Sequence, residues 1–171
     1  GITMYLQNRQ CYLSGPIEFD SGYNWRTEPK KVFTEKFKIN VFDPHADPKQ
    51  QWVEEIQQAR VNEDWEKLAQ RAEEFVGKDL GIVDRSDFLI AYLPYRVPTA
   101  GTHHEIINAW NLKKPVMLVS EHKGNIPVWY FGFIPHKYMF GSWDALYAYL
   151  DEVNDGLHKD NKKWSMVYGL I

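Results

Sequence analysis

The chain has 171 residues, of which 44% are hydrophobic, so it can bury one substantial core and is expected to form a single domain over residues 1–171. Its net charge of −3, with acidic and basic residues mixed along the chain, argues against binding to a nucleic-acid polymer. A single cysteine excludes an internal disulfide framework, and no segment reaches the roughly 20 apolar residues of a membrane span. We therefore expect a soluble, cytoplasmic protein without a membrane partner.

The first half of the chain alternates between strand-like and helix-like segments. The run "QCYLSGP" predicts a strand that is ended by its Gly-Pro pair, and "KINVFDP" predicts a second strand that is ended by Asp-Pro. Residues 24–37 between them predict a helix with Pro29 in its first turn, where proline is tolerated. The pattern of residues 48–85 is helical, because apolar residues recur at three- and four-residue spacing. These apolar residues are Trp65, Leu68, Ala69, Ala72, Phe75 and Val76.

The second half of the chain continues the alternation. The runs "DFLIAYLP" and "PVMLVS" are short and continuously apolar, which is typical of strands covered by helices on both faces. A helix that buries Ile106, Ala109 and Trp110 is expected between them. The run "HKYMF" predicts a last strand, and Ser142 begins the helix that follows it. The apolar residues of this last helix are Leu146, Tyr149, Leu150 and Val153.

Strands that alternate with helices predict an α/β fold, a doubly wound five-stranded parallel sheet of the flavodoxin or Rossmann kind with helices on both faces. Ligands of such folds bind at the carboxyl ends of the strands. The loops that follow the expected strands are long and rich in glycine, proline and aromatic residues. Long loops on a small scaffold are more often functional than accidental.

The stretch "AGTHHEI", residues 100–106, places the acid Glu105 at a junction between a strand and a helix. One interpretation is capping, because a carboxylate in the first helical turn complements the positive end of the helix dipole. The other is that Glu105 is a nucleophile, which a helix N-terminus would keep in the ionised form that attacks. The residue types alone leave both interpretations open.

Asp79 is a second acid in an unusual position. It follows Phe75 by four residues and Val76 by three, so a helix would point it along the apolar stripe. It is either a buried acid satisfied by a backbone amide or by Arg85, or a functional acid that delivers a proton.

Motifs for metals and cofactors do not occur in the sequence. His103 and His104 are adjacent, so on a helix they point in different directions and cannot face one metal ion. Neither the dinucleotide fingerprint GxGxxG nor the phosphate-binding pattern GxxxxGK[ST] is found. We expect no metal and no cofactor.

Three motifs in this order resemble the nucleoside 2-deoxyribosyltransferase family, which includes deoxyribonucleoside 5′-monophosphate N-glycosidases. The motifs are "YLSGPI" at the first strand, the acid of "KDLGIVDRSD" before the third strand, and "GTHHEI" at the following helix. The resemblance runs from about Tyr12 to Val119. The long loop at residues 121–133 and the tail after Leu157 depart from the short members of the family.

The resemblance implies a role for each matching residue. It assigns the catalytic nucleophile to Glu105 and the acid beside the base and sugar to Asp79. Retaining cleavage of an N-glycosidic bond needs such a carboxylate on the sugar face opposite the base, and a proton donor for the departing base. The expected substrate-binding residues are Tyr12, Ser14, Gly15, Pro16, Ile17, Trp25, Arg26, Thr99, Gly101 and Thr102. Aromatic residues that could stack on a base are Tyr23, Trp25, Trp129, Tyr130 and Phe131.

Thr99 bears on the choice of substrate. Transferases of the family that act on free nucleosides tend to carry aspartate at this position, and the monophosphate hydrolases tend to carry serine. Threonine is uncharged and can donate a hydrogen bond to a phosphate, as could Ser14 and Arg26. Beside Pro98, it can equally make a hydrogen bond within a turn.

The leading expectation is an enzyme that transfers 2-deoxyribose between nucleobases. The alternatives are hydrolysis of a nucleoside 5′-monophosphate, and a sensor on the same fold that binds a nucleotide without catalysis. The expected partners are a nucleoside or nucleotide and a free nucleobase. The resemblance also implies a homodimer or a larger homo-oligomer.

Overall fold

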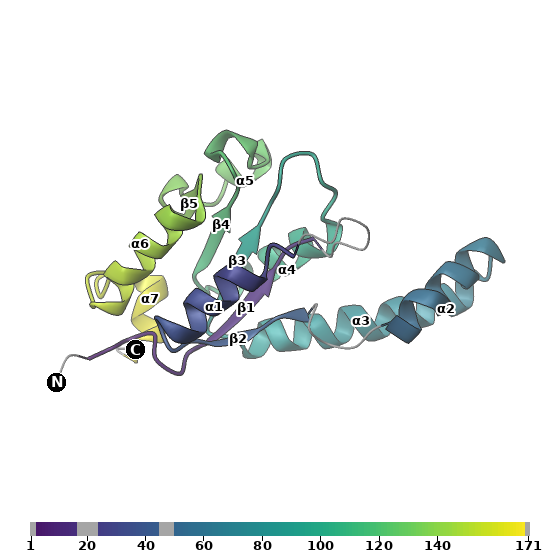
Figure 1. Cartoon of the computed structure of the whole chain (residues 1–171), viewed down its shortest axis with the longest axis horizontal. Helices are drawn as coiled ribbons and strands as arrows, with labels where there is room; N and C mark the ends of the chain where they lie inside the picture. The colour runs from purple at the N-terminus through teal and green to yellow at the C-terminus, as the bar shows by residue number, and fades with distance from the viewer. Residues whose placement is uncertain (1–2, 17–23, 45–49, 170–171) are drawn as a thin grey trace.

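The computed structural model describes residues 3–16, 24–44 and 50–169, and its centre is a five-stranded sheet (Figure 1). The strand order is β2-β1-β3-β4-β5, and all neighbouring strands are parallel. The strands are β1 (Gln10–Ser14), β2 (Asn40–Phe42), β3 (Phe88–Tyr92), β4 (Val116–Val119) and β5 (Met139–Phe140). The predicted fold class is therefore confirmed, with each strand inside its predicted run.

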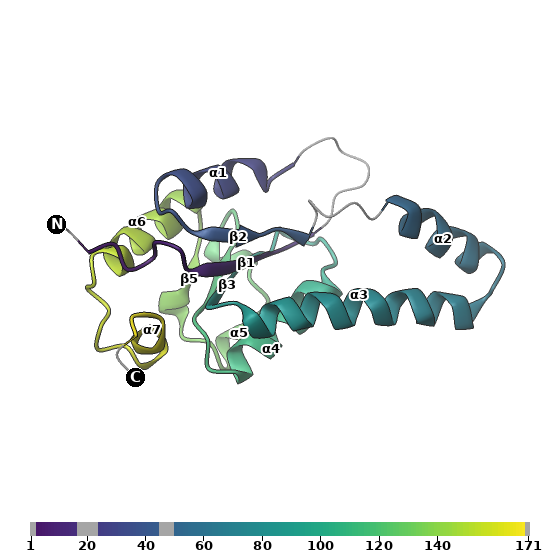
Figure 2. The same cartoon turned by 90° about the horizontal axis from the view of Figure 1, so that it is seen from below.

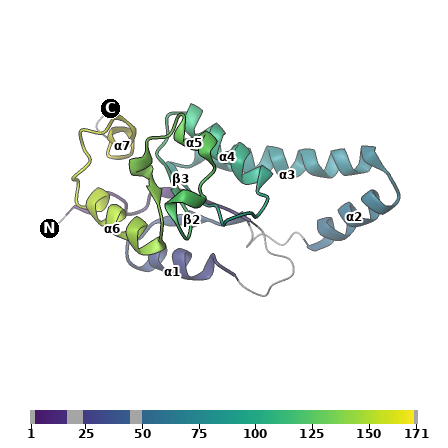
Figure 3. The same ribbon diagram turned by 90° about the horizontal axis from the view of Figure 1, so that it is seen from above.

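One face of the sheet is covered by α1 (Thr27–Glu35) and α6 (Trp143–Asn154), as Figure 3 shows. Cys11 and Leu13 of β1 point to this face and join a core that includes Phe33 of α1. The short helix α7 (Lys162–Val167) closes the core with the fully buried Trp164. Ser142 caps α6 by accepting a hydrogen bond from the Ala145 amide at 3.1 Å, which agrees with its predicted role as the helix start.

The opposite face is covered by α4 (Ala100–Asn111) and by the C-terminal part of α3 (Trp65–Arg85). Tyr12 points to this face, because alternate residues of a strand face opposite sides of the sheet. It packs in a core with Val83 of α3 and Ile106 of α4. The loop after β4 adds η2 (Lys123–Asn125), α5 (Val128–Phe131) and η3 (His136–Tyr138), whose Tyr130 and Tyr138 complete this second core.

Strands β1 and β3 mark the point where the chain changes direction across the sheet. From β1 the chain goes outward to β2 and then returns past β1 to β3, so the crossovers on either side of this pair diverge. Ser14 at the end of β1 lies opposite Ala91 in β3. In a doubly wound sheet, ligands bind at the carboxyl ends of the strands where the chain changes direction in this way.

The helical prediction for residues 48–85 is confirmed where the structure describes them, and the segment is divided into two helices. They are α2 (Gln50–Val61) and α3, and residues 48–49 lie outside the described part of the chain. Glu63 between the helices has a positive φ of 54°, which an α-helix does not allow. Asp64 then caps α3, because its side chain accepts a hydrogen bond from the Lys67 amide at 3.2 Å.

The sequence pattern predicted that the apolar stripe of α3 packs on the core. In the structure, only part of its length does so. Trp65 is 60% exposed and Val76 is 47% exposed. A helix of 21 residues is about 30 Å long, whereas a five-residue strand spans about 17 Å. The first half of α3 therefore runs beyond the sheet, with α2 beside it (Figure 2). Within residues 3–16, 24–44 and 50–169, no helix combines the length and the apolar character of a membrane span.

Candidate active site

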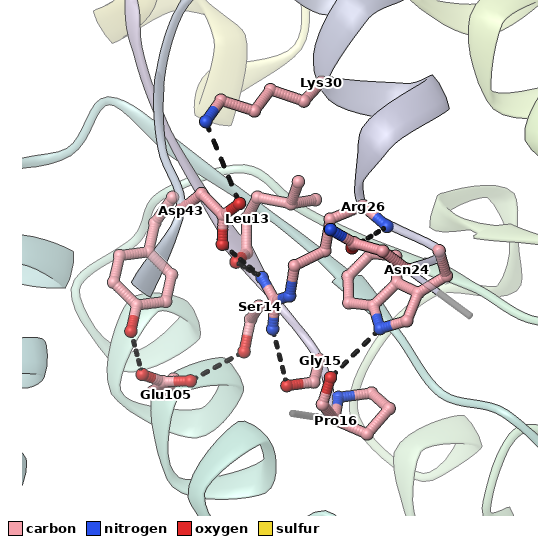
Figure 4. A network of polar contacts seen from close by, with 11 residues as sticks. Leu13, Ser14, Gly15, Pro16, Asn24, Arg26, Lys30, Asp43 and Glu105 are labelled. Carbon is pink, nitrogen blue, oxygen red and sulfur yellow. Dashed lines mark hydrogen bonds and ion pairs between the residues drawn. The ribbon is translucent and has the colours of Figure 1, made fainter. Parts of the chain in front are cut away.

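Glu105 lies on the face of α4 that packs against the sheet. The helix begins at Ala100, so Glu105 is its sixth residue and belongs to the second turn. The expectation that Glu105 lies in the first turn is therefore wrong, and the helix dipole, whose effect fades within one turn, is not what stabilises its charge. Its side chain points toward the carboxyl end of β1 (Figure 4).

Two hydroxyl groups of β1 hold the Glu105 carboxylate. The Tyr12 hydroxyl donates a hydrogen bond to Oε2, and the Ser14 hydroxyl donates one to Oε1 at 2.7 Å. Tyr12 and Ser14 are two residues apart, so the period of the strand puts both side chains on the face that α4 covers. The three side chains are buried, Glu105 at 9% exposure and the other two at 0%. The structure thus brings together three residues that the sequence predicted for the site.

Opposing effects act on the charge of Glu105. Burial raises the pKa of Glu105, the hydrogen bonds from Tyr12 and Ser14 lower it, the negative charge of Asp79 raises it, and the positive charge of Arg26 lowers it. The net result is a pKa above the ordinary glutamate value, because burial outweighs the two donors. Burial and the charge of Glu105 also raise the pKa of Tyr12, so its hydroxyl remains a donor.

A second carboxylate shows how burial and hydrogen bonds compete. Glu121, just after β4, also accepts hydrogen bonds from one tyrosine and one serine, Tyr92 and Ser120. Burial is the largest single effect on Glu121 and raises its pKa, but the hydrogen bonds from Tyr92, Ser120 and two backbone amides together lower the pKa below the ordinary value. In the more deeply buried Glu105, two hydroxyl donors do not outweigh burial, and the pKa lies above the ordinary value.

Asp79 is a half-buried residue of α3 on the same side of the sheet. Its charge acts on both Tyr12 and Glu105, raising the pKa of each. Long-range packing therefore brings the two acids that the sequence singled out, from α3 and α4, to the carboxyl end of β1.

Arg26 was predicted to contact substrate, but its side chain is buried at 1% exposure behind β1. It forms an ion pair with Asp43, with Nη1 and Oδ1 3.1 Å apart, and Lys30 lies 3.9 Å from the other carboxylate oxygen. Sequence reasoning did not select Asp43. The sequence did contain a signal for Asp43, because this residue directly follows the carboxyl end of β2, and ligands bind at the carboxyl ends of parallel strands.

Gly15, Pro16 and Trp25 form a tight corner after β1. A Cβ atom on Gly15 would lie 2.7 Å from Cη2 of Trp25, so only glycine fits. The Trp25 indole donates a hydrogen bond to the Pro16 carbonyl at 3.0 Å, and its ring packs against both Tyr92 and Trp143, which also contact each other. Trp25 is 3% exposed and belongs to the core. Two further predicted residues, Ile17 and Tyr23, lie outside the described part of the chain.

The start of α4 holds the remaining predicted residues. Thr99 is 8% exposed, and its Oγ1 lies 3.1 Å from Nε2 of His103, whose Nδ1 bonds to the Tyr130 hydroxyl. Burial lowers the pKa of His103, so the ring is neutral at pH 7. Thr102 is buried, while Gly101 is exposed with open space where a Cβ would stand.

The aromatic residues predicted to stack on a base divide into two groups. Tyr130 is 2% exposed and forms part of the core, whereas Trp129 is 77% exposed and Phe131 is 44% exposed. Among the residues that the structure describes, no group of three histidine, cysteine, aspartate or glutamate side chains is placed to hold a metal ion.

Comparison with known proteins adds no assignment to this geometry. Neither a family model nor a curated protein sequence matches the chain. The functional argument therefore rests on the residues of the site.

Proposed function

We propose that the protein transfers 2-deoxyribose between nucleobases and that Glu105 is the nucleophile. One observation carries the proposal, namely a buried carboxylate held by two hydroxyl donors where β1 and β3 end. A buried carboxylate is costly to keep in a fold unless it is used, and two donors orient both of its oxygens while leaving lone pairs for attack. The resemblance in the three sequence motifs independently assigns the same role to Glu105.

In the proposed first half-reaction, a Glu105 oxygen attacks C1′ of the deoxynucleoside. The bond between C1′ and the base nitrogen breaks, and its electron pair goes to the base. Asp79 supplies the proton that makes the base a better leaving group. The sugar remains on Glu105 as an ester. In the second half-reaction a different base attacks C1′ and returns its proton to Asp79, which frees Glu105.

A second candidate, hydrolysis of a nucleoside 5′-monophosphate, differs in what attacks the ester. Water would replace the second base and give a free sugar phosphate. The observation that favours this candidate is Thr99, which is uncharged where a carboxylate would repel a phosphate. A nucleotide sensor would use the same contacts without turnover.

One assay separates the three functions. The protein is incubated with a deoxynucleoside and a foreign base, and separately with the matching 5′-monophosphate, and the products are resolved by chromatography. A transferase makes the new deoxynucleoside only when the foreign base is present. A hydrolase releases base from the monophosphate without an acceptor. A sensor makes neither product but binds the nucleotide in a calorimetric titration, and that outcome would contradict both enzymatic proposals.

Loss of one donor should shift the pH dependence of the reaction. In Ser14→Ala, Glu105 loses the hydroxyl that favours its ionised form, so its pKa rises further above the ordinary value. The acid limb of kcat/KM should therefore move to higher pH by up to about one unit, because activity needs ionised Glu105. A pH profile from 4 to 9 measures the shift. Thr34→Ala, a hydroxyl deletion on the exposed surface of α1, is the control that should leave the limb in place.

Thr99→Asp should discriminate between nucleoside and nucleotide. If Thr99 faces the 5′ end of the substrate, the carboxylate should penalise the monophosphate relative to the nucleoside by about 1–3 kcal/mol, roughly 5- to 150-fold in kcat/KM. Thr99→Val removes the hydroxyl and its contact with His103 without adding charge, so it reports the contribution of that hydrogen bond alone. A ratio of the two kcat/KM values that is the same in Thr99→Asp and wild type would show that Thr99 does not read the 5′ end.

Self-association remains part of the proposal. The apolar stripe on α3 is exposed at Trp65 and Val76 and half-buried at Leu68 and Phe75, and helices normally bury such a stripe fully. The same helix carries Asp79 four residues after Phe75, so a partner on the stripe would lie next to the proposed site.

A further inference from the structure

Arg26 contacts the backbone on both sides of Ser14. Its Nη1 donates a hydrogen bond to the Leu13 carbonyl at 2.8 Å, and its Nη2 donates one to the Gly15 carbonyl at 2.8 Å. One planar guanidinium thus spans residues 13–15, where β1 ends and the following loop begins. Its Nη1 also donates a hydrogen bond to Asp43 at 3.1 Å. Figure 4 shows this guanidinium on the opposite side of the strand end from Glu105.

We propose that Arg26 is a positioning residue for Glu105, because with Asp43 it clamps the backbone around Ser14 and so holds the Ser14 hydroxyl on the carboxylate. The proposal deepens the function proposed above, and its kinetic consequences rest on that function. Its geometric and electrostatic consequences do not, because they concern only residues of this chain.

The clamp depends on the shape of arginine. A guanidinium presents donors in a rigid plane, so it can reach two carbonyls and a carboxylate at once, whereas a lysine ammonium is a single point on a flexible stem. The plane is also packed in place, because its Cζ lies 4.4 Å from the centre of the Trp25 ring. Trp25 in turn is bonded to the Pro16 carbonyl. The corner after β1 is therefore held from both sides.

The charge of Arg26 also reaches Glu105. The charged and titratable groups that act on Glu105 are Tyr12 of β1, Asp79 of α3 and Arg26 before α1, and Ser14 adds a neutral donor. Among them only Arg26 is positive, and it lowers the pKa of Glu105. Asp43 on the far side of Arg26 carries the opposite charge. Removing Arg26 or removing the charge of Asp43 should therefore change the pKa of Glu105 in opposite directions.

The kinetic test uses Arg26→Lys, which keeps the positive charge but removes the planar set of donors that reaches both carbonyls. If Ser14 is held by the clamp, kcat should fall about 10- to 100-fold while KM changes by less than about threefold, because a small misplacement of a reacting group costs rate more than binding. Lys36→Met is the matched control, since it removes an exposed cation at the end of α1 whose partner is Asp151 at 3.0 Å. Wild-type kcat in a folded Arg26→Lys protein would overturn the clamp.

The second test measures the pKa of Glu105 directly by NMR titration of protein labelled with ¹³C at the glutamate carboxyl carbon, with the Glu105 signal assigned from its loss in Glu105→Gln. The pKa should rise in Arg26→Met and fall in Asp43→Asn, which retains the oxygen that accepts from Arg26. No shift in Arg26→Met, or shifts of the same sign in both variants, would overturn the proposal. Opposite shifts in a protein without glycosyl transfer would support the positioning role and contradict the proposed function.

A double variant guards against loss of the fold. Arg26→Met alone takes the nearer cation away from the buried Asp43 carboxylate, whereas Arg26→Met with Asp43→Leu removes both charges together. This double variant should fold, as judged by circular dichroism and a cooperative melt, and should still lose the same 10- to 100-fold in kcat as Arg26→Lys. A folded double variant with wild-type kcat would contradict the proposal.

Discussion

Glu105→Gln is expected to abolish glycosyl transfer while leaving the protein at least as stable as wild type at neutral pH. The amide has the shape of the carboxylate and can still accept a hydrogen bond from Tyr12 or Ser14, but it is a poor nucleophile. We expect kcat to fall by three or more orders of magnitude, on the scale seen when a nucleophile is removed. Steady-state rates of base exchange and thermal melts at pH 7 measure the two effects.

The stability part of this prediction follows from the direction of the pKa shift. The folded protein holds the Glu105 proton more tightly than the unfolded chain does, because the folded pKa lies above the ordinary value of 4.5. Wild-type stability therefore falls as the pH rises from 4.5 to the raised pKa, and the loss persists at higher pH. Glu105→Gln lacks this penalty, so its advantage in melting temperature should be present at pH 7–8 and absent at pH 4.

The comparison that isolates the nucleophile is Glu121→Gln, because Glu121 has the same two kinds of donor but is exposed. Relative to wild type, Glu121→Gln should not become more stable as the pH rises. A 2-fluoro-2-deoxy nucleoside should leave the mass of the sugar on the peptide that contains Glu105 in wild type and not in Glu105→Gln. Activity of Glu105→Gln within about tenfold of wild type, or the sugar mass on another peptide, would remove Glu105 from the role.

Asp79→Asn is expected to have the next largest effect, and the effect should depend on the leaving group. Asparagine keeps the size and much of the hydrogen bonding of aspartate but has no proton to give. Transfer from natural deoxynucleosides should fall by about 10²- to 10⁴-fold. A 7-methylpurine deoxynucleoside, whose base leaves without protonation, should lose much less. Single-turnover rates with both substrates measure the difference.

The matched control is Asp84→Asn on the same helix, because the Asp84 side chain is exposed and bonds to Asn108 at 2.8 Å. It should leave both rates near wild type. Equal losses on the two substrates in Asp79→Asn would show that Asp79 supports the structure of the site and does not donate the proton.

The sheet was predictable because its signals are local. "DFLIAYLP" and "PVMLVS" are continuous apolar runs, and alternation with helices allows only a parallel sheet with short crossovers. Ligands bind at the carboxyl ends of such strands, so a site near Ser14 could be expected from the sequence, whereas the strand order that places β1 beside β3 comes from the structure. The break before α3 also had a local signal, because Asp64 is a capping residue and the regular apolar spacing begins only at Trp65.

Other features depend on contacts between residues far apart in the chain, which no local pattern encodes. The sequence by itself placed Tyr12 and Ser14 on a strand and Glu105 on a helix. The hydrogen bonds from Tyr12 and Ser14 to Glu105, however, join residues that are 93 and 91 positions apart. Likewise, the residue type allows Arg26 to bind either a ligand or its own backbone. The tertiary structure decides between these two roles. The packing of α1 against β1 and β2 buries Arg26 next to Asp43, and a buried guanidinium needs hydrogen-bond partners inside the fold, so Arg26 binds the backbone.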